Sequence, residues 1–270
     1  MRKYVLTFIA ACLAAVVVAS AGARTVKIAP PAKIAQAGKI VWCSDIEYPP
    51  FEVFQGSKAV GADIDIATGI SAAMGVKAEF KNVVFDSIIA ALLTKKCDAI
   101  VSAMNDTPER RKVVDFVDYL KVGQSLMVKK GNPKHISTLE SLGGKAVSVQ
   151  SGTTMRAFLA ATSARLVKRG KQGFTIRTFP KDTDAIAALK AGRVDAYFAD
   201  SPVVAFYVSK DSSLAIAGSP ISPLPYGLAI RKHDPLRLAV QKAVNQLYAT
   251  GAMRRIAAKW GMSKAVVFLR

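Results

Sequence analysis

Charged side chains stand at the ends of several predicted strands, where they can act together on one ligand. Arg110 occupies the third position of a predicted helix that starts with the cap Thr107 and with Pro108, and Asp200 ends an apolar strand. A guanidinium at a helix N-terminus binds a carboxylate through two parallel hydrogen bonds. If Arg110 and Asp200 face one another across a cleft, they fit a zwitterion whose carboxylate lies on Arg110 and whose ammonium lies on Asp200.

Each of these residues also has a simpler explanation. Arg110 can form an ion pair with Asp106 or Asp115, which is the more common role of a single arginine. Asp200 can act as the N-cap of the helix that follows it. The presence of both residues in one cleft is therefore stronger evidence for a zwitterion-binding site than either residue alone.

Two turns carry further groups that can line a pocket. Asp45 and Tyr48 lie on a turn stiffened by two prolines, which has little conformational entropy to lose on binding. The alternative is a rigid surface turn with Phe51 in the core. Thr153 and Thr154 stand at another helix start and offer hydroxyl and amide hydrogen bonds, although ordinary helix capping explains them equally well.

An internal repeat predicts the elements that position these groups. Segments with helical periodicity at 85–95 and 183–191 both contain Ala-Ala-Leu, and each is followed by an apolar strand, at 99–103 and 196–199. This alternation predicts an α/β fold with two lobes, each a mainly parallel sheet flanked by helices. The cleft between them lies at the carboxyl ends of the strands. A single doubly wound domain is the alternative, which the repeat disfavours.

The chain is expected to cross between the lobes twice, which produces a double-strand hinge. The predicted first lobe comprises residues 39–127 and 226–270, and the second comprises residues 128–225. Residues 24–38 contain prolines and no periodicity, and they are expected to form a flexible leader.

The N-terminus has the features of an export signal. A basic start precedes an apolar run and the small residues at 21–23, so residues 1–23 are predicted to be a cleaved signal peptide. The run is shorter than the roughly 20 residues of a membrane-spanning helix. Lipid attachment at Cys12 is not expected, because the apolar run continues well past it. These features predict a soluble protein of the periplasm.

The composition narrows the range of partners. The 270 residues are 51% hydrophobic, which suits one or two globular domains with a full core. A net charge of +19 first suggests nucleic acid, but an exported protein meets anionic membrane surface instead. The 3 cysteines and 2 histidines are scattered, so neither a metal site nor another cofactor is predicted.

Several motifs in fixed order resemble one family. SDIEYPPF, GADIDIATGI, VQSGTT and LKAGRVDAYFADSP are similar to stretches of the polar-amino-acid solute-binding proteins of bacterial ABC importers, over residues 40–261. The resemblance implies a type II periplasmic-binding-protein-like fold that closes around one small amino-acid-like ligand. It also implies delivery of that ligand to the permease subunits of an ABC transporter.

The resemblance implies roles for particular residues as well. Arg110 matches the position that holds the ligand α-carboxylate, and Asp200 matches the position that holds the α-ammonium group, while Thr154 and the backbone near Asn105 complete this clamp. Other positions often line the side-chain pocket in the family. The full predicted ligand-binding set is Asp45, Tyr48, Phe85, Asn105, Arg110, Thr153, Thr154 and Asp200.

The charges of this set suggest a ligand class. Two carboxylates and one guanidinium give the cleft a formal charge of −1, which favours a cationic or neutral polar ligand over an acidic one. The chain also departs from the family pattern: Asn105 stands where a hydroxyl residue is frequent, Ala103 lacks a hydroxyl, and Asp106 can compete for Arg110. The identity of the ligand does not follow from the resemblance.

Cys43 in the first strand and Cys97 at the start of the third are expected to be neighbours in the sheet. Export makes a disulfide possible, and some members of the resembled superfamily carry cysteines at similar places. Because the register of the strands is not known from sequence, a bridge and two buried thiols remain equally open.

Three functions compete at this stage. The leading prediction is a binding protein without covalent chemistry, and thus not an enzyme. A cyclohexadienyl-dehydratase-like enzyme is the second, with Asp45, Glu47 or Asp106 as the acid. An accessory protein of a periplasmic dehydrogenase is the third, and failure to bind any small ligand would favour it.

Overall fold

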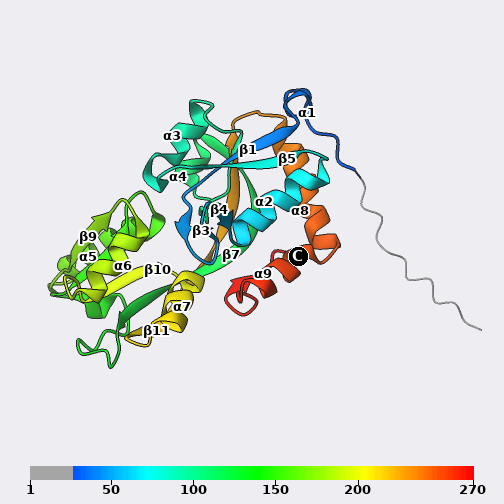
Figure 1. The fold of residues 1–270 in the computed structure, drawn as a ribbon. Coiled ribbons are helices and arrows are strands. Elements are labelled where there is room, and N and C mark those ends of the chain that lie inside the picture. The colour runs from blue at the N-terminus through cyan, green and yellow to red at the C-terminus, as the bar shows by residue number, and fades with distance from the viewer. Residues whose placement is uncertain (1–26) are drawn as a thin grey trace, which may run out of the picture.

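The computed structural model describes residues 27–270, which form two lobes joined by long strands (Figure 1). The predicted signal peptide at 1–23, Cys12 and the beginning of the leader lie outside the described residues. No helix within 27–270 is long and apolar enough to cross a membrane. The predicted α/β fold with two lobes is confirmed.

The first lobe is formed by both ends of the described chain. Its elements are α1 (Ala32–Ala37), β1 (Lys39–Ser44), β2 (Glu47–Tyr48), β3 (Glu52–Gln55), β4 (Lys58–Val60), α2 (Ala62–Ala73), β5 (Lys77–Asn82), η1 (Phe85–Ser87), α3 (Ile88–Leu93), β6 (Ala99–Ile100), α4 (Pro108–Arg111), α8 (Leu236–Ala249), α9 (Ala252–Lys259) and β12 (Val266–Val267). The second lobe contains η2 (Glu140–Leu142), β8 (Ala146–Gln150), α5 (Thr154–Lys168), β9 (Thr175–Phe179), α6 (Asp182–Lys190), β10 (Ala196–Asp200) and α7 (Ser201–Lys210).

Two long strands, β7 (Val114–Lys129) and β11 (Leu214–Arg231), run through both lobes as an antiparallel pair. They connect all the main strands into one sheet of order β5-β1-β6-β11-β7-β10-β8-β9. Within each lobe the neighbouring β1, β5 and β6, or β8, β9 and β10, are parallel. The register of β7 and β11 shifts around Ile221, between the lobes, and this irregular stretch forms the double-strand hinge.

The buried cores show where the hinge strands change lobes. Val117 and Tyr119 of β7 pack in the core of the first lobe, whereas Leu126 and Met127 pack in cores of the second. These last two residues fall within 39–127, the range that the sequence assigned to the first lobe. The crossing on β7 therefore lies a few residues earlier than that boundary.

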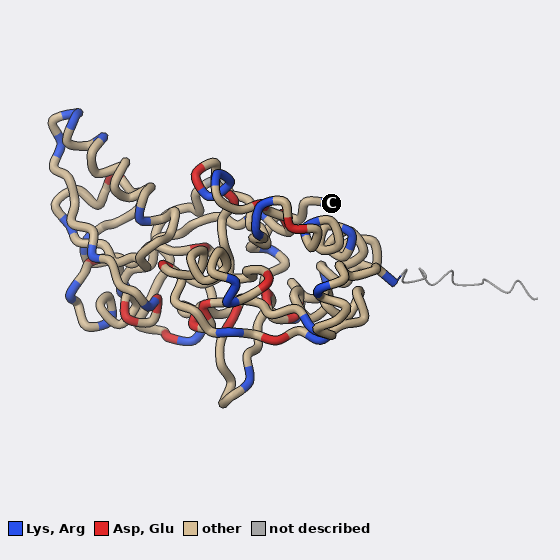
Figure 2. Tube along the Cα trace, turned by 90° about the horizontal axis from the view of Figure 1, so that it is seen from above, with Lys and Arg blue, Asp and Glu red and all other residues tan. Residues whose placement is uncertain are grey.

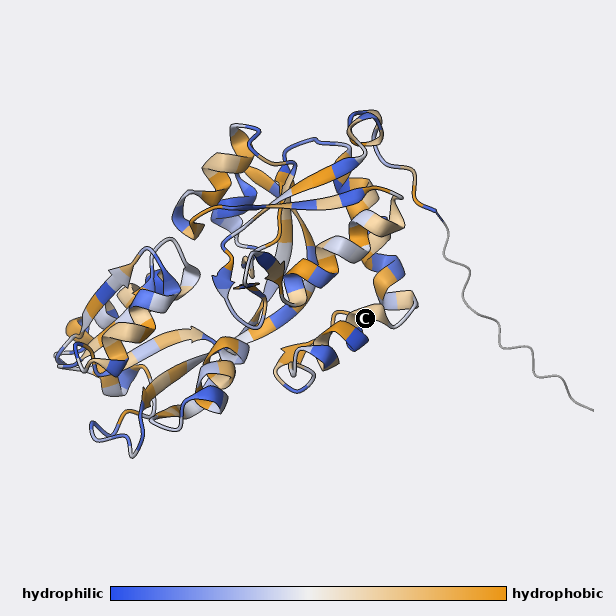
Figure 3. Ribbon diagram, in the orientation of Figure 1, coloured by the Kyte–Doolittle hydropathy of each residue, from blue (hydrophilic) through white to orange (hydrophobic). Residues whose placement is uncertain are grey.

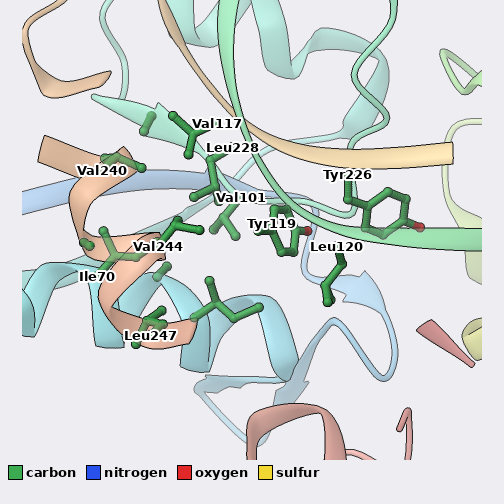
Figure 4. Packing of buried hydrophobic residues seen from close by; sticks show 14 of the residues in the cluster. Ile70, Val101, Val117, Tyr119, Leu120, Tyr226, Leu228, Val240, Val244 and Leu247 are labelled. Atoms are coloured by element: carbon green, nitrogen blue, oxygen red, sulfur yellow. The ribbon is translucent and has the colours of Figure 1, made fainter. Parts of the chain in front are cut away.

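The core of the first lobe lies between the sheet and two helices. Ile70 of α2 and Val240, Val244 and Leu247 of α8 meet the strand residues in Figure 4. In Figure 3 the central strands of this lobe are mostly hydrophobic, and the helices that cover them carry both hydrophobic and hydrophilic residues. This packing provides a rigid base for the loops at the carboxyl ends of the strands.

Two expectations about local structure are corrected. The leader is helical at Ala32–Ala37, and Ile28 and Ile34 are buried against the first lobe, so residues 27–38 pack onto the fold and do not form a flexible segment. The predicted strand at 99–103 is regular only at Ala99–Ile100. Beyond it the backbone turns, with Ala103 at φ 44°, and its amide points to the Asp63 carboxylate.

Cys43 and Cys97 form a disulfide in the core beneath α3. Cys43 lies on β1, and Cys97 stands just before β6, which pairs with β1 in parallel. The alternative of two free thiols is therefore not realised.

Candidate functional site

All eight predicted ligand-binding residues line one cavity between the lobes. Asp45, Phe85 and Arg110 follow strands of the first lobe, whereas Thr154 follows β8 and Asp200 ends β10 in the second lobe. Five further residues complete the lining, namely Glu52, Ser102, Ala103, Gln150 and Met155. The carboxyl ends of the parallel strands thus meet at the cleft, as open α/β sheets require.

Arg110 lies on α4 and points across the cleft. Its Nη1 donates to the carbonyl of Asn105 at 2.8 Å, and its Nη2 donates to the carbonyl of Gly152 in the other lobe at 3.0 Å. The guanidinium also stacks over Phe85, 5.4 Å from the ring centroid. Burial lowers the pKa of Arg110 to about 10, so it remains a cation at neutral pH.

Asp106 does not compete with the ligand for Arg110, because Asp106 is bound by the neighbouring Arg111. Arg111 forms a bidentate ion pair with Asp106, which leaves Arg110 facing the cavity. Thr107 caps α4 by accepting from the amide of Arg110, so the predicted helix start is confirmed.

Asp200 is 1% exposed at the start of α7. Its side chain does not cap that helix, and its Oδ2 accepts from the Tyr48 hydroxyl of the first lobe at 2.7 Å. Its Oδ1 has no hydrogen-bond partner within residues 27–270, and the nearby Tyr226 hydroxyl lies outside bonding geometry. Burial raises the pKa of Asp200 to about 6, although the Tyr226 and Tyr48 hydroxyls and Arg110 oppose this rise.

Asp45 occupies the opposite wall. Its Oδ2 accepts from the Phe85 amide at 3.1 Å and from Gln150 Nε2, in the second lobe, at 2.7 Å. Burial raises the pKa of Asp45 to about 6, against the lowering effect of the bonds from Gln150 and Phe85. Phe51 on the same turn is fully buried, so the turn both anchors the core and presents Asp45.

The hydroxyl groups have different roles. Thr154 donates to Asn105 Oδ1 across the cleft at 2.6 Å, while Asn105 Nδ2 is buried without a partner among the described residues. Thr153 accepts from the amide of Arg156 and caps α5, as the simpler explanation predicted. Thr153 also lines the cavity, so capping and lining coincide at this residue.

Sequence reasoning missed the other lining residues. Gln150 is the last residue of β8 and could have been found by the same strand-end rule. Glu52 and Ser102 had no local signal, because their hydrogen bond joins β3 to a loop far along the chain. A cluster of three or more metal-ligating side chains is absent from the described part of the chain.

The lobes are closed on one another. Besides the contacts above, Glu47 accepts from Lys181 at 2.7 Å and from Thr183 at 3.3 Å at the rim. Inside the cavity, the centre of a water molecule has about 10 Å³ in which to lie. The cavity therefore has room for about one water molecule. An amino acid can therefore enter only when the lobes open.

Gly152 allows this close approach. It has φ +72°, and a Cβ there would meet Asp86 Oδ1 of the other lobe at 2.6 Å. We expect Gly152→Ala to hinder closure and to weaken ligand binding about tenfold, measured by calorimetry together with small-angle scattering. Gly170→Ala is the matched control, because Gly170 has φ +68° and nothing within 4 Å of its Cβ position. Equal affinities of the two variants would contradict the role of Gly152 in closure.

A hinged α/β fold with a polar cleft between its lobes defines a binding protein that closes around a small molecule. The chain belongs to the bacterial extracellular solute-binding proteins, family 3, whose model matches residues 40–263. It is 30% identical to the L-cystine-binding protein TcyJ of Escherichia coli (strain K12), over 84% of each chain.

Solved structures agree with this assignment. The chain is 36% identical to an ancestral arginine-binding protein solved with arginine and with glutamine, with a TM-score of 0.77 over 83% of this chain and 98% of that one. It is 34% identical to AncCDT-1, an ancestral amino acid-binding protein and precursor of cyclohexadienyl dehydratase, with a TM-score of 0.77 over 84% and 97% of the chains.

These findings confirm the leading prediction of a type II solute-binding protein of the ABC-importer class. The family consists of binding proteins, and even AncCDT-1 is described as an amino acid-binding protein. The dehydratase and accessory-protein alternatives are not supported.

Proposed function

We propose that this protein binds a cationic or neutral polar amino acid between its lobes. The α-carboxylate lies on Arg110, where it replaces the carbonyls of Asn105 and Gly152 as the acceptor of the guanidinium. The α-ammonium lies on the unpartnered Oδ1 of Asp200, and the side chain extends toward Asp45. Thr154 and Asn105, which are bonded to each other, are freed to bind the ligand when the lobes open.

The acidic lining of the cavity carries the proposal. Asp45 and Asp200 line it together with one cation, Arg110, so an acidic side chain would add like charge to a buried site. Figure 2 shows Asp and Glu mainly toward the middle of the molecule, whereas Lys and Arg occur throughout it. The relatives that bind arginine, glutamine and cystine support the same ligand class.

A thermal-shift panel tests the proposal on the chain from Arg24 onward. A ligand at a hundred times its Kd adds about 2.7 kcal/mol of stability, so binding amino acids stand out. We expect the largest shifts with arginine, ornithine, lysine, citrulline or glutamine. A panel in which glutamate or aspartate gives the largest shift would contradict the proposed preference.

The affinity for a cationic amino acid is expected to depend on pH. Asp45 and Asp200 both have pKa values of about 6, and a bound cation requires their ionised forms. Binding is therefore strongest above pH 7, and at about pH 5 it weakens about tenfold for each carboxylate that must lose its proton. Calorimetry between these pH values measures the effect, and Asp45→Asn should remove part of it. A Kd that does not change over this range would contradict these assignments.

We further infer that the protein works in the periplasm after removal of residues 1–23 and delivers its ligand to the permease of an ABC transporter. The predicted export signal and the extracellular character of the family support this inference. Detection of the uncleaved chain in the cytoplasm would contradict it.

A further inference from the structure

Glu52 is a buried acid in the wall of the ligand cavity. It begins β3, is 0% exposed and lines the cavity together with Asp45. Its Oε1 accepts a hydrogen bond from Ser102 Oγ at 3.0 Å, and its Oε2 has no such partner in residues 27–270. An ionised carboxylate buried with so few donors is strongly disfavoured.

Ser102 connects Glu52 to Asp45. The single hydroxyl hydrogen of Ser102 goes to Glu52, so its oxygen is oriented to accept from the backbone amide of Asp45 at 2.9 Å. Ser102 is itself buried. Glu52 thus determines the orientation of the hydroxyl that holds the cavity residue Asp45 in place.

Asp63 on α2 is the immediate acidic neighbour of Glu52. Asp63 accepts from the amide of Ala103 at 2.7 Å and from the Tyr119 hydroxyl at 2.8 Å, and such donors favour its ionised form. Burial, and then repulsion from Asp63, raise the pKa of Glu52 well above its usual range. Asp63 receives donors from Ala103 and Tyr119, whereas the hydrogen bond from Ser102 is the one that Glu52 receives within residues 27–270. Of the two neighbouring acids, Glu52 is therefore the one that keeps a proton.

Other charged and titratable groups face this pair from the surrounding elements. Asp45 adds repulsion at the end of β1, and Tyr119 approaches from β7. Asp200 at the end of β10 and Arg110 on α4 line the same cavity. Among these groups Arg110 is the only cation, and it lies on the side of the α-carboxylate clamp, so a ligand cation is the group that can replace the proton of Glu52.

We propose that Glu52 holds a proton in the cavity wall and releases it to solvent when a ligand with a cationic side chain occupies the cavity. A neutral ligand leaves the proton in place. The proton release rests on the proposed function, whereas the protonated state of Glu52 without ligand does not. Two experiments test the protonated state of Glu52 and the proton release separately.

The first experiment measures thermal unfolding without ligand, comparing the wild type with Glu52→Gln from pH 4.5 to pH 8. A carboxyl group whose pKa is raised on folding stabilises the protein below its unfolded pKa of 4.5 and loses this contribution as the pH rises toward its folded value. The Tm of Glu52→Gln should therefore rise relative to wild type by several degrees over this range. A constant Tm difference would overturn the protonated state of Glu52.

The second experiment is calorimetry with L-arginine and with L-glutamine at about pH 8 in phosphate and in Tris, whose ionisation enthalpies differ. At this pH Asp45 and Asp200, with pKa values of about 6, are already ionised. For the wild type we expect release of up to about one proton with arginine and none with glutamine. Glu52→Gln should bind arginine within about threefold of wild type but without proton release.

The controls separate a specific role from a general effect of charge or packing. Glu79→Gln removes a carboxylate at the protein surface, where Glu79 pairs with Lys39, and should release protons as the wild type does. Glu52→Ala removes the partner of Ser102 and should weaken ligand binding about tenfold. Glu52→Gln should restore the affinity. Proton release that persists in Glu52→Gln, or is absent in wild type that binds arginine, would overturn the proposal. If arginine and glutamine do not bind at all, the proposed function fails while the unfolding experiment still decides the state of Glu52.

Discussion

Arg110→Ala is expected to lower the affinity for the amino acid by about a hundredfold or more. The guanidinium is half-buried beside Phe85 and already makes two hydrogen bonds to backbone carbonyls, so its position is set before the ligand arrives. Loss of a buried partner leaves the ligand carboxylate desolvated and unpaired, which costs roughly 2–5 kcal/mol. Calorimetric titration with L-arginine measures the effect.

Lys112→Ala serves as the matched control for this variant. Lys112 follows Arg110 on the same turn, but its side chain is exposed to solvent, so removal of this cation should change the affinity little. Circular dichroism and thermal unfolding show whether each variant folds. A folded Arg110→Ala protein with unchanged affinity would refute the carboxylate clamp.

Loss of the disulfide is expected to have the largest effect on stability. Cys43 and Cys97 are 54 residues apart in sequence, and closing a loop of this length stabilises the fold by about 4 kcal/mol through the entropy of the unfolded chain. For a chain of this size, we expect Cys43→Ala/Cys97→Ala to lower the Tm by roughly 10 °C. Calorimetric unfolding of both proteins measures the difference.

Reductant provides the control for the disulfide. It should lower the Tm of the wild type toward that of the double variant and leave the variant unchanged. The ligand affinity of the variant should stay close to that of wild type at low temperature, because both cysteines are buried in the core beneath α3 and outside the cavity. If reductant also lowered the Tm of the variant, the lower Tm of the reduced wild type could not be attributed to this disulfide.

Much of the site follows from local sequence rules. Thr107-Pro108 predicts a helix start and hence the place of Arg110, and apolar strands predict that Asp45 and Asp200 follow at their carboxyl ends. The internal repeat predicts two lobes, and the motif order predicts the family. These features are readable because capping, strand period and chain direction act over short distances.

Contacts between distant segments decided the remaining features. Arg111 and not Arg110 takes Asp106, because the two side chains leave the short helix in different directions. The hydrogen bond from Ser102 to Glu52 and the acid pair with Asp63 join three separate segments, and no spacing rule brings them together. The register that places Cys97 beside Cys43 likewise depends on the pairing of β6 with β1.

The same distinction applies to the leader and the cavity. The proline-containing stretch before β1 has no periodicity of its own, yet Ile28 and Ile34 bind to an apolar surface that forms only when α2 and α8 pack. The pairing of Tyr48 with Asp200 and of Gln150 with Asp45 depends on how far the lobes close. Local patterns in the chain therefore determine which groups reach the cleft, whereas burial and cross-lobe hydrogen bonds, which exist only in the folded protein, determine their charge and their partners.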